Sequence, residues 1–286
     1  MDNWYTLAII ALILMGTQSF LYKVSAERNC NTAWTTFSFM ATVALLSSVV
    51  FFLRSESVPN ITFTFFVGIL NSSAFLVATM THIEALKRLP SSIVYSIVRL
   101  NVVVVVLFSI VYFKDRPTYY QIAGIMLAVI VILILTRQPE AEEPSAGQTK
   151  GGLILVFVSL FCGSIASISS KFAAMHANPL TFMAISYLFS TLFSIGLRNK
   201  LQTEPAQANY KEALAIGLSM GLINFAGYYT FLKALSIGPL SIVIANIGLH
   251  FVIAILLSVM IYKEKLTPPI IAGISLTILS VILLRH

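Results

Sequence analysis

The sequence predicts an all-α integral membrane protein of ten transmembrane helices, built as two inverted five-helix repeats. The first observation is composition: 58% of the 286 residues are hydrophobic and 10% are charged, whereas soluble domains carry roughly 25% charged residues. The second is segregation, because stretches such as 153–170 and 240–262 carry no charge. The third is an internal repeat. A soluble core could not bury this much apolar surface, so lipid must solvate much of the chain.

Ten apolar runs account for the predicted helices, since about 20 residues are enough to cross a bilayer. The runs must be helical, because unpaired strands could not satisfy their backbone in lipid and the alternating segments of a membrane barrel are missing from the sequence. The first run lacks a basic leader and a cleavage site, which predicts a helix and not a removable signal. The runs cover 4–24, 33–53, 62–86, 91–113, 118–137, 151–174, 179–198, 211–235, 239–261 and 268–285.

The second half of the chain repeats the first. A shift of 149 residues aligns 85–137 with 234–286 without a gap, and Lys23 matches Lys171 once small gaps are allowed. The chain therefore divides into an N-terminal repeat over 1–137, a polar linker over 138–150 and a C-terminal repeat over 151–286. The matched pairs include Pro90/Pro239, Ser92/Ser241, Ser109/Ser258, Lys114/Lys263 and Gly124/Gly273, and Asp115-Arg116 aligns with Glu264-Lys265.

The odd number of helices in each half has a consequence for topology. The second half must enter the membrane from the opposite side, so the repeat is inverted. In transporters built this way, the substrate site usually lies between the halves near the bilayer midplane, and the halves rock around it. The architecture therefore favours a transporter that works by alternating access.

The segments repeated between the halves are Ala85-Leu86…Pro90-Ser91-Ser92 with Ala234-Leu235…Gly238-Pro239-Leu240-Ser241, and the hairpins Lys114-Asp115-Arg116 with Lys263-Glu264-Lys265. Together with Gly16…Lys23 in the first run, they resemble the ten-helix EamA branch of the drug/metabolite transporter superfamily. The resemblance covers essentially the whole chain. It implies two intertwined five-helix halves around a central cavity, and export or exchange of amino acids or related metabolites.

Two features of the chain bear on that resemblance. Family members often carry a proline inside the fourth and ninth helices, but this chain has Arg99-Leu100-Asn101 and Gly248-Leu249-His250 there. The runs 91–113 and 239–261 are therefore expected to form one helix each. More Lys and Arg residues follow the odd-numbered helices, which places both termini outside by the positive-inside rule, whereas the resemblance implies that both termini lie inside.

Arg99 is the leading site candidate, because polar groups inside a spanning helix are costly and therefore usually functional. It lies about nine residues past Pro90, near mid-membrane, and the spacing of Ser92, Tyr95 and Arg99 places them on one helix face. In one interpretation, Arg99 offers its guanidinium fork to a substrate carboxylate, sulfonate or phosphate. In the other, it forms a structural pair with Glu84. A gating pair would combine both roles.

Further polar residues extend the candidate site. Asn246 and His250, four residues apart, either line a cavity or form a packed pair. Asn224 and Tyr228 share a helix face with two small residues, which fits either a cavity wall or helix packing. The predicted substrate-binding set is Arg99, Tyr95, Asn101, Asn224, Tyr228, Asn246, His250, Gln18 and Asn71, and the predicted coupling or gating residues are Glu84 and His82.

Other charged positions have simpler interpretations. Lys23 and Lys171 are expected to snorkel to the membrane interface, and the repeated hairpins to serve as anchors and helix caps. The first helix has Gln18 but no acid, and of the carboxylates only Glu84 falls inside an apolar run. Proton-driven export of cationic drugs is therefore disfavoured. We expect facilitated diffusion or exchange, with proton coupling through Glu84 or His250 as the alternative.

Several other classes are disfavoured. No paired acidic motif, metal-spaced His cluster or nucleophile with a base is visible, so no enzyme, cofactor or metal site is predicted. Cys30 and Cys162 suggest no disulfide framework. The net charge of +7 comes from Lys and Arg scattered at helix ends, which is typical of membrane anchors and not of a nucleic-acid surface.

The expected partners are a small-molecule substrate and the lipid bilayer. The internal repeat predicts function as a monomer, and the compact chain with short tails favours a prokaryotic inner membrane. The remaining alternative function is a flippase for lipid or lipid-linked head groups. A flippase should open a lateral groove with basic residues near the headgroup level.

Overall fold

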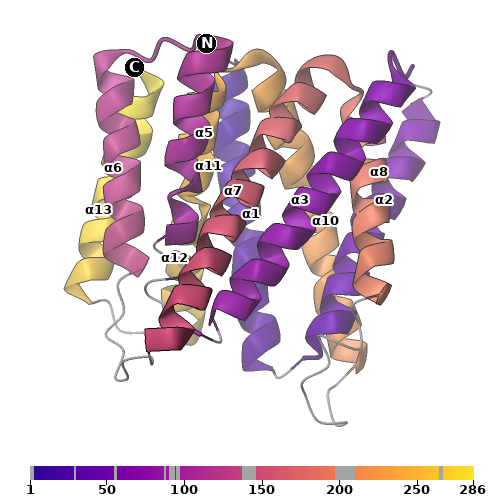
Figure 1. Ribbon diagram of the computed structural model, residues 1–286, viewed down its shortest axis with the longest axis horizontal. Helices are drawn as coiled ribbons and strands as arrows, with labels where there is room; N and C mark the ends of the chain where they lie inside the picture. Colours follow the sequence, from indigo (N-terminus) through magenta and orange to yellow (C-terminus); the bar gives the residue numbers. More distant parts are fainter. Residues whose placement is uncertain are drawn as a thin grey trace.

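The computed structural model is a bundle of helices over the residues that it describes (Figure 1). These residues are 3–28, 30–54, 57–86, 88–89, 94, 97–136, 146–196, 210–263 and 267–286. The first half contains α1 (Asn3–Glu27), α2 (Thr32–Arg54), α3 (Ile61–Leu86), α5 (Asn101–Phe108), the π-helical turn η1 (Ser109–Phe113) and α6 (Tyr119–Thr136). The second half contains α7 (Ala146–His176), α8 (Pro179–Gly196), α10 (Tyr210–Ile237), α11 (Leu240–Gly248), α12 (His250–Tyr262) and α13 (Pro268–Arg285).

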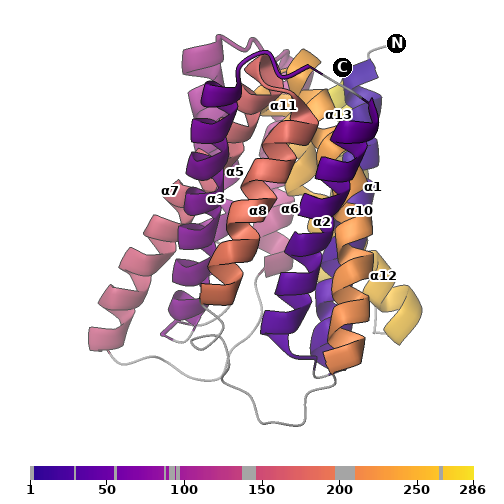
Figure 2. The same ribbon diagram turned by 90° about the vertical axis from the view of Figure 1, so that its right-hand side faces the viewer.

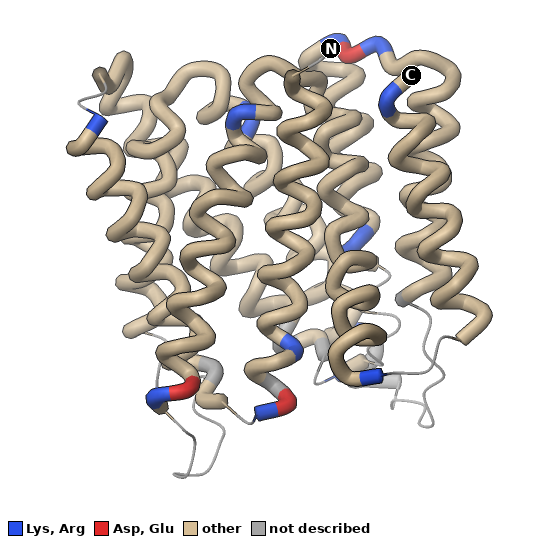
Figure 3. Tube along the Cα trace, turned by 180° about the vertical axis from the view of Figure 1, so that it is seen from behind, with Lys and Arg blue, Asp and Glu red and all other residues tan. Residues whose placement is uncertain are grey.

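The helices have the lengths and surfaces of membrane spans. Eight spans among the described residues are long and apolar enough to cross a bilayer, and the shorter apolar helices 97–113 and 119–135 complete the predicted ten. Large apolar side chains face outward: Phe52, Leu53 and Val111 are between 76% and 79% exposed. Charged residues gather mostly at the two ends of the bundle (Figure 3). Such a surface is stable only in lipid, and the predicted fold class is confirmed.

The course of the chain defines two ends of the bundle. We call the end with Asn3 and Arg285 the terminal face, and the opposite end, where α6 finishes and α7 begins, the linker face (Figure 1). α1 begins at the terminal face, whereas α7, the matching first helix of the second half, begins at the linker face. The two halves therefore run in opposite directions, as the odd number of helices predicted.

The two halves are intertwined. α3 packs on α7, α2 packs on α8 and α10, α1 packs on α10 and α12, and α6 packs on α13, so each of these contacts joins one half to the other (Figure 2). Two glycines let α10 lie directly on α2. A Cβ at Gly217 would meet the Thr35 carbonyl oxygen at 2.5 Å, and one at Gly221 would meet the Thr42 Cβ at 2.5 Å. Close backbone contact of this kind holds helices together where lipid provides no hydrophobic force.

The fourth and ninth helices are broken at equivalent positions, so the expectation of one continuous helix for each run was wrong. The Leu100 amide donates to the Ile97 carbonyl and the Leu249 amide to the Asn246 carbonyl, both at 3.0 Å. Each bond spans three residues instead of the four of an α-helix, and this local tightening interrupts the helix without a proline. Leu100 and Leu249 are 149 residues apart, so the breaks obey the sequence repeat.

The repeated hairpins begin with residues in an unusual backbone conformation. Lys114 and Lys263 have φ angles of 56° and 53°, and each ends the helix before it, η1 and α12 respectively. A left-handed residue is a common way to end a helix, although it is uncommon for residues other than glycine. Because the two lysines occupy equivalent positions, the structural role predicted for the hairpins applies to both halves.

Candidate functional site

A cavity of about 470 Å³ lies in the middle of the bundle and is lined by both halves. Its wall follows α3 from Asn71 to His82 and α1 from Met15 to Tyr22, in both cases toward the end of the helix at the linker face. Of α11, which starts at the terminal face, the lining takes only residues between Ile244 and Gly248. The cavity therefore extends from the centre of the bundle toward the linker face.

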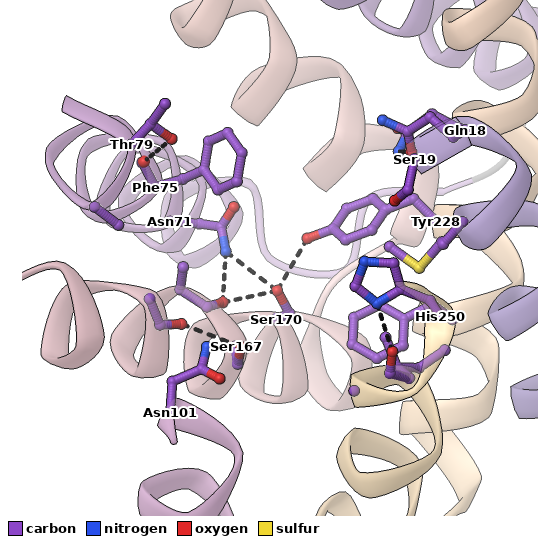
Figure 4. A pocket seen from close by; sticks show the side chains of 18 of the residues that line it. Gln18, Ser19, Asn71, Phe75, Thr79, Asn101, Ser167, Ser170, Tyr228 and His250 are labelled. Atoms are coloured by element: carbon purple, nitrogen blue, oxygen red, sulfur yellow. Dashed lines mark hydrogen bonds between the residues drawn. The ribbon is translucent and has the colours of Figure 1, made fainter. Parts of the chain in front are cut away.

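Asn71 forms the first polar part of the wall. Its amide nitrogen donates to the Ala166 carbonyl oxygen at 2.7 Å and lies 2.9 Å from the Ser169 hydroxyl and 3.1 Å from the Ser170 hydroxyl (Figure 4). The Ser170 and Tyr228 hydroxyls are 2.9 Å apart. This network connects α3 of the first half to α7 and α10 of the second. A primary amide has only two hydrogens, so the three acceptors around Asn71 share them.

Asn224 forms the second polar part of the wall. Its amide nitrogen donates to Gln18 Oε1 at 2.7 Å, and its oxygen accepts a hydrogen bond from the Tyr187 hydroxyl at 2.6 Å. The amide of Gln18 also lies 3.4 Å from the Tyr22 hydroxyl. This chain joins α1 of the first half to α8 and α10 of the second. Both polar networks therefore cross the boundary at which the halves would have to move.

The cationic part of the wall is near the break in the fourth helix. Arg99 lines the cavity and lies over the Phe251 ring, with Cζ 5.4 Å from the ring centroid. His250 also lines it, and its Nδ1 lies 2.6 Å from the Ile247 carbonyl oxygen. Because a carbonyl can only accept, Nδ1 carries the hydrogen. Asn101 packs against α7 at Gly163, where an added Cβ would lie 3.3 Å from its amide nitrogen.

The structure brings most of the predicted site residues together in this cavity. Two fall outside the description: Tyr95 is not among the described residues, and nothing is described of the Glu84 side chain, so its pairing with Arg99 stays a prediction. That the gathered residues bind substrate also stays a prediction. The residues that share the cavity wall are Arg99, Asn101, Asn224, Tyr228, His250, Gln18, Asn71 and His82.

Asn246 has a different position from the predicted one. It is 0% exposed and is not part of the cavity wall, and neither its amide nitrogen nor its oxygen has a hydrogen-bond partner within bonding geometry among the described residues. Its spacing of four from His250 predicted a common face on one continuous helix. The break at Leu249 puts Asn246 in α11 and His250 in α12, so the two side chains are no longer in register.

Sequence reasoning missed the aromatic part of the wall. Tyr187 on α8 touches both polar networks, since it bonds to Asn224 and its ring lies 5.8 Å from that of Tyr228. Nothing in the sequence around Tyr187 distinguishes it from the tyrosines at membrane interfaces. The remaining aromatic residues of the wall are Tyr22, Phe39, Phe75 and Phe231.

Lys171 does not snorkel as expected. It is only 7% exposed, and its ammonium donates to the carbonyl oxygens of Leu235 at 2.6 Å and Gly238 at 2.8 Å. These carbonyls lie at the end of α10, where the helix leaves backbone acceptors unpaired. The lysine stays inside the protein because these acceptors replace the water that it would otherwise reach.

The described residues contain no group of three or more His, Cys, Asp or Glu side chains placed to hold a metal ion. The polar wall consists instead of amides, hydroxyls, two imidazoles and one guanidinium. Such groups can exchange hydrogen bonds with a polar solute and hold an anionic group, and the aromatic rings offer apolar surface to the rest of it.

Ten spans in two inverted, intertwined halves with a polar cavity between them define the architecture of a membrane transporter. The chain belongs to the EamA-like transporter family, whose sequence profile matches residues 2–137 and again residues 150–285. The resemblance recognised in the repeated segments is confirmed, and the chain is a multi-pass integral membrane protein.

One solved structure, titled "Crystal structure of protein", is similar to this chain with a TM-score of 0.78 and 14% identity. The similarity covers 99% of this chain and 96% of the other. At this identity the likeness shows the fold alone. A search of curated proteins gave no match.

Proposed function

We propose that the protein is a secondary transporter of small polar metabolites that carry an anionic group, such as amino acids, and that it works by alternating access through the central cavity. The observation that carries this proposal is the charge of the wall. Among the described residues, Arg99 is the only Lys or Arg that lines the cavity, and no Asp or Glu lines it.

Arg99 is well placed to select an anion. It adjoins the break at Leu100, halfway through the bundle, where water is partly excluded. Two unit charges 4 Å apart interact by about 4 kcal/mol at an effective dielectric constant of about 20. A carboxylate beside Arg99 gains on that order, and a cation loses a similar amount. The planar guanidinium can also hold a carboxylate through two hydrogen bonds, and its stacking on Phe251 orients that plane.

The shape of the cavity supports a carrier. Its wall reaches from the centre toward the linker face, while all nine residues of α11 at the terminal face are buried. This is the geometry of one of the two states that alternating access requires. The absence of carboxylates from the described wall favours facilitated diffusion or exchange, with proton coupling through Glu84 or His250 as the alternative. We place the protein in a prokaryotic inner membrane and expect the monomer to be functional.

The test is efflux from proteoliposomes preloaded with amino acids, organic acids, nucleosides and amines, with mass spectrometry of what leaves. We expect the parent to release acidic or zwitterionic solutes and Arg99→Gln to lose them. Arg99→Lys should retain part of the release, because the charge stays while the fork is lost. The matched control is Arg54→Gln, which removes an exposed arginine outside the cavity.

Two results would contradict the proposal. Release of amines in preference to anions would mean that Arg99 does not set the charge selectivity. Movement of labelled lipid between leaflets, with no release of soluble compounds, would replace the carrier with the flippase.

A further inference from the structure

A buried polar cluster at the terminal face lies outside the cavity. Asp115 Oδ2 accepts hydrogen bonds from the Ser241 amide at 3.0 Å, from the Ser241 hydroxyl at 2.7 Å, and from the Ser109 hydroxyl. Both serines are 0% exposed. Lys171 completes the cluster, because Asp115 attracts its ammonium electrostatically and the Phe113 ring lies 5.7 Å from its Nζ.

Asp115 caps a helix of the other half. α11 begins after Pro239, and no side chain of its own N-cap residue bonds to its first amides. Asp115, from the hairpin between η1 and α6 in the first half, supplies the missing acceptor to the amide of Ser241, the second residue of the helix. Its negative charge also lies at the positive end of the helix dipole. The contact thus joins the two halves where they must separate to open the terminal face.

The burial pattern associates this cap with closure. Every residue of α11, including 246–248, is buried. The equivalent residues 97–99 of the first half, which lie toward the linker face, are only half-buried. The same pair of segments is therefore closed over at the terminal face and partly accessible toward the linker face, in agreement with the direction in which the cavity extends.

The sequence contains a second copy of the cluster for the linker face. Asp115, Ser241, Ser109 and Lys171 correspond to Glu264, Ser92, Ser258 and Lys23. Glu264 and Ser92 lie outside the described residues. Lys23 donates to the Ser258 hydroxyl at 2.5 Å, so Ser258 is engaged by a lysine, whereas its equivalent Ser109 is engaged by a carboxylate.

We propose that Asp115 is a latch that holds the terminal face closed, and that Glu264 is the matching latch of the linker face in the opposite conformation. The inference rests on the proposed alternating access. A static cap would stabilise both conformations equally and change no populations. A latch breaks each time its own face opens, so weakening it shifts the protein toward the state in which that face is open.

The test measures the side from which the cavity can be reached. Ser167 lines the cavity and is half-buried, so Ser167→Cys is the reporter, in a background with Cys30→Ser and Cys162→Ser. A membrane-impermeant anionic maleimide is added to oriented vesicles from either side. Asp115→Asn should raise the ratio of terminal-face to linker-face labelling by about tenfold, the effect of weakening one charge-assisted hydrogen bond. Glu264→Gln should lower that ratio.

Two further variants keep the result interpretable. Ser241→Ala removes only the hydroxyl donor and should shift the ratio in the same direction as Asp115→Asn, which serves if the latter does not fold. Glu212→Gln removes a carboxylate from α10 outside both clusters and should leave the ratio unchanged.

The latch is refuted if Asp115→Asn and Glu264→Gln shift the ratio in the same direction, or if neither shifts it more than Glu212→Gln does. Labelling needs no substrate, so unchanged ratios in a parent that transports would refute only the latch. A parent that neither transports nor allows labelling from both sides would refute the proposed function as well.

Discussion

Gly217→Ala is the sharpest test of how the halves are held together. The new Cβ would lie 2.5 Å from the Thr35 carbonyl oxygen and 2.7 Å from the Ser38 Cβ, whereas ordinary contact begins at 3.4 Å. Because the nearest atom belongs to the backbone, α10 must move away from α2 by about 0.9 Å, the difference between 3.4 Å and 2.5 Å. Overpacking of this kind costs about 1–3 kcal/mol, and the gain in helix propensity offsets up to about 1 kcal/mol of that.

We therefore expect Gly217→Ala to lower the free energy of unfolding by about 1–2 kcal/mol. The assay is reversible unfolding in mixed micelles, in which a denaturing detergent is titrated into a mild one. The matched control is Gly196→Ala on α8, where an added Cβ meets nothing within 4 Å. Equal stability of the two variants would refute the reasoning, because it would mean that α10 and α2 tolerate the extra separation freely.

The remaining predictions concern single polar groups. Asn224→Leu should abolish efflux and lower the free energy of unfolding by about 1 kcal/mol in the same micelle assay, because two hydrogen bonds between helices are lost and each contributes about 0.6 kcal/mol in a membrane. Lys171→Met should lower the melting temperature, since two buried carbonyls lose their donor, and an unchanged melting temperature would contradict that role. Glu212 raises the pKa of the exposed Arg28 guanidinium, so this residue stays charged and Arg28→Gln should leave stability unchanged between pH 6 and 8 by about the error of the measurement. Lys150→Cys should react with an impermeant thiol reagent from outside the cell if the family resemblance sets the orientation, and from inside if the positive-inside rule does.

Much of the candidate site could be predicted because lipid penalises polar side chains strongly. Gln18, Asn71, Asn101 and Asn224 stand out in otherwise apolar runs, and each lines the cavity. A membrane helix tolerates an amide only where protein or water can satisfy it. An isolated polar residue in such a helix therefore reports on its surroundings more directly than it would in a soluble protein.

The errors arise where a side chain's environment depends on distant segments. Asn246 satisfied the same criterion, but the break at Leu249 turned it away from the cavity. Lys171 was expected to reach the interface, but the end of α10 offered two carbonyl oxygens nearer by. Tyr187 gave no signal, since its importance comes from α10 packing beside α8.

The sequence by itself determined the number of spans, the two inverted halves and the apolar surface, because these depend on local hydrophobicity, helix length and an internal repeat. The tertiary structure alone decided where the fourth and ninth helices break, which face of the bundle is closed and which polar groups meet. Those outcomes depend on contacts between residues more than 100 positions apart, such as Asp115 with Ser241. A periodic sequence pattern specifies which residues share a helix face, but the partner of that face is chosen only when all the helices have packed.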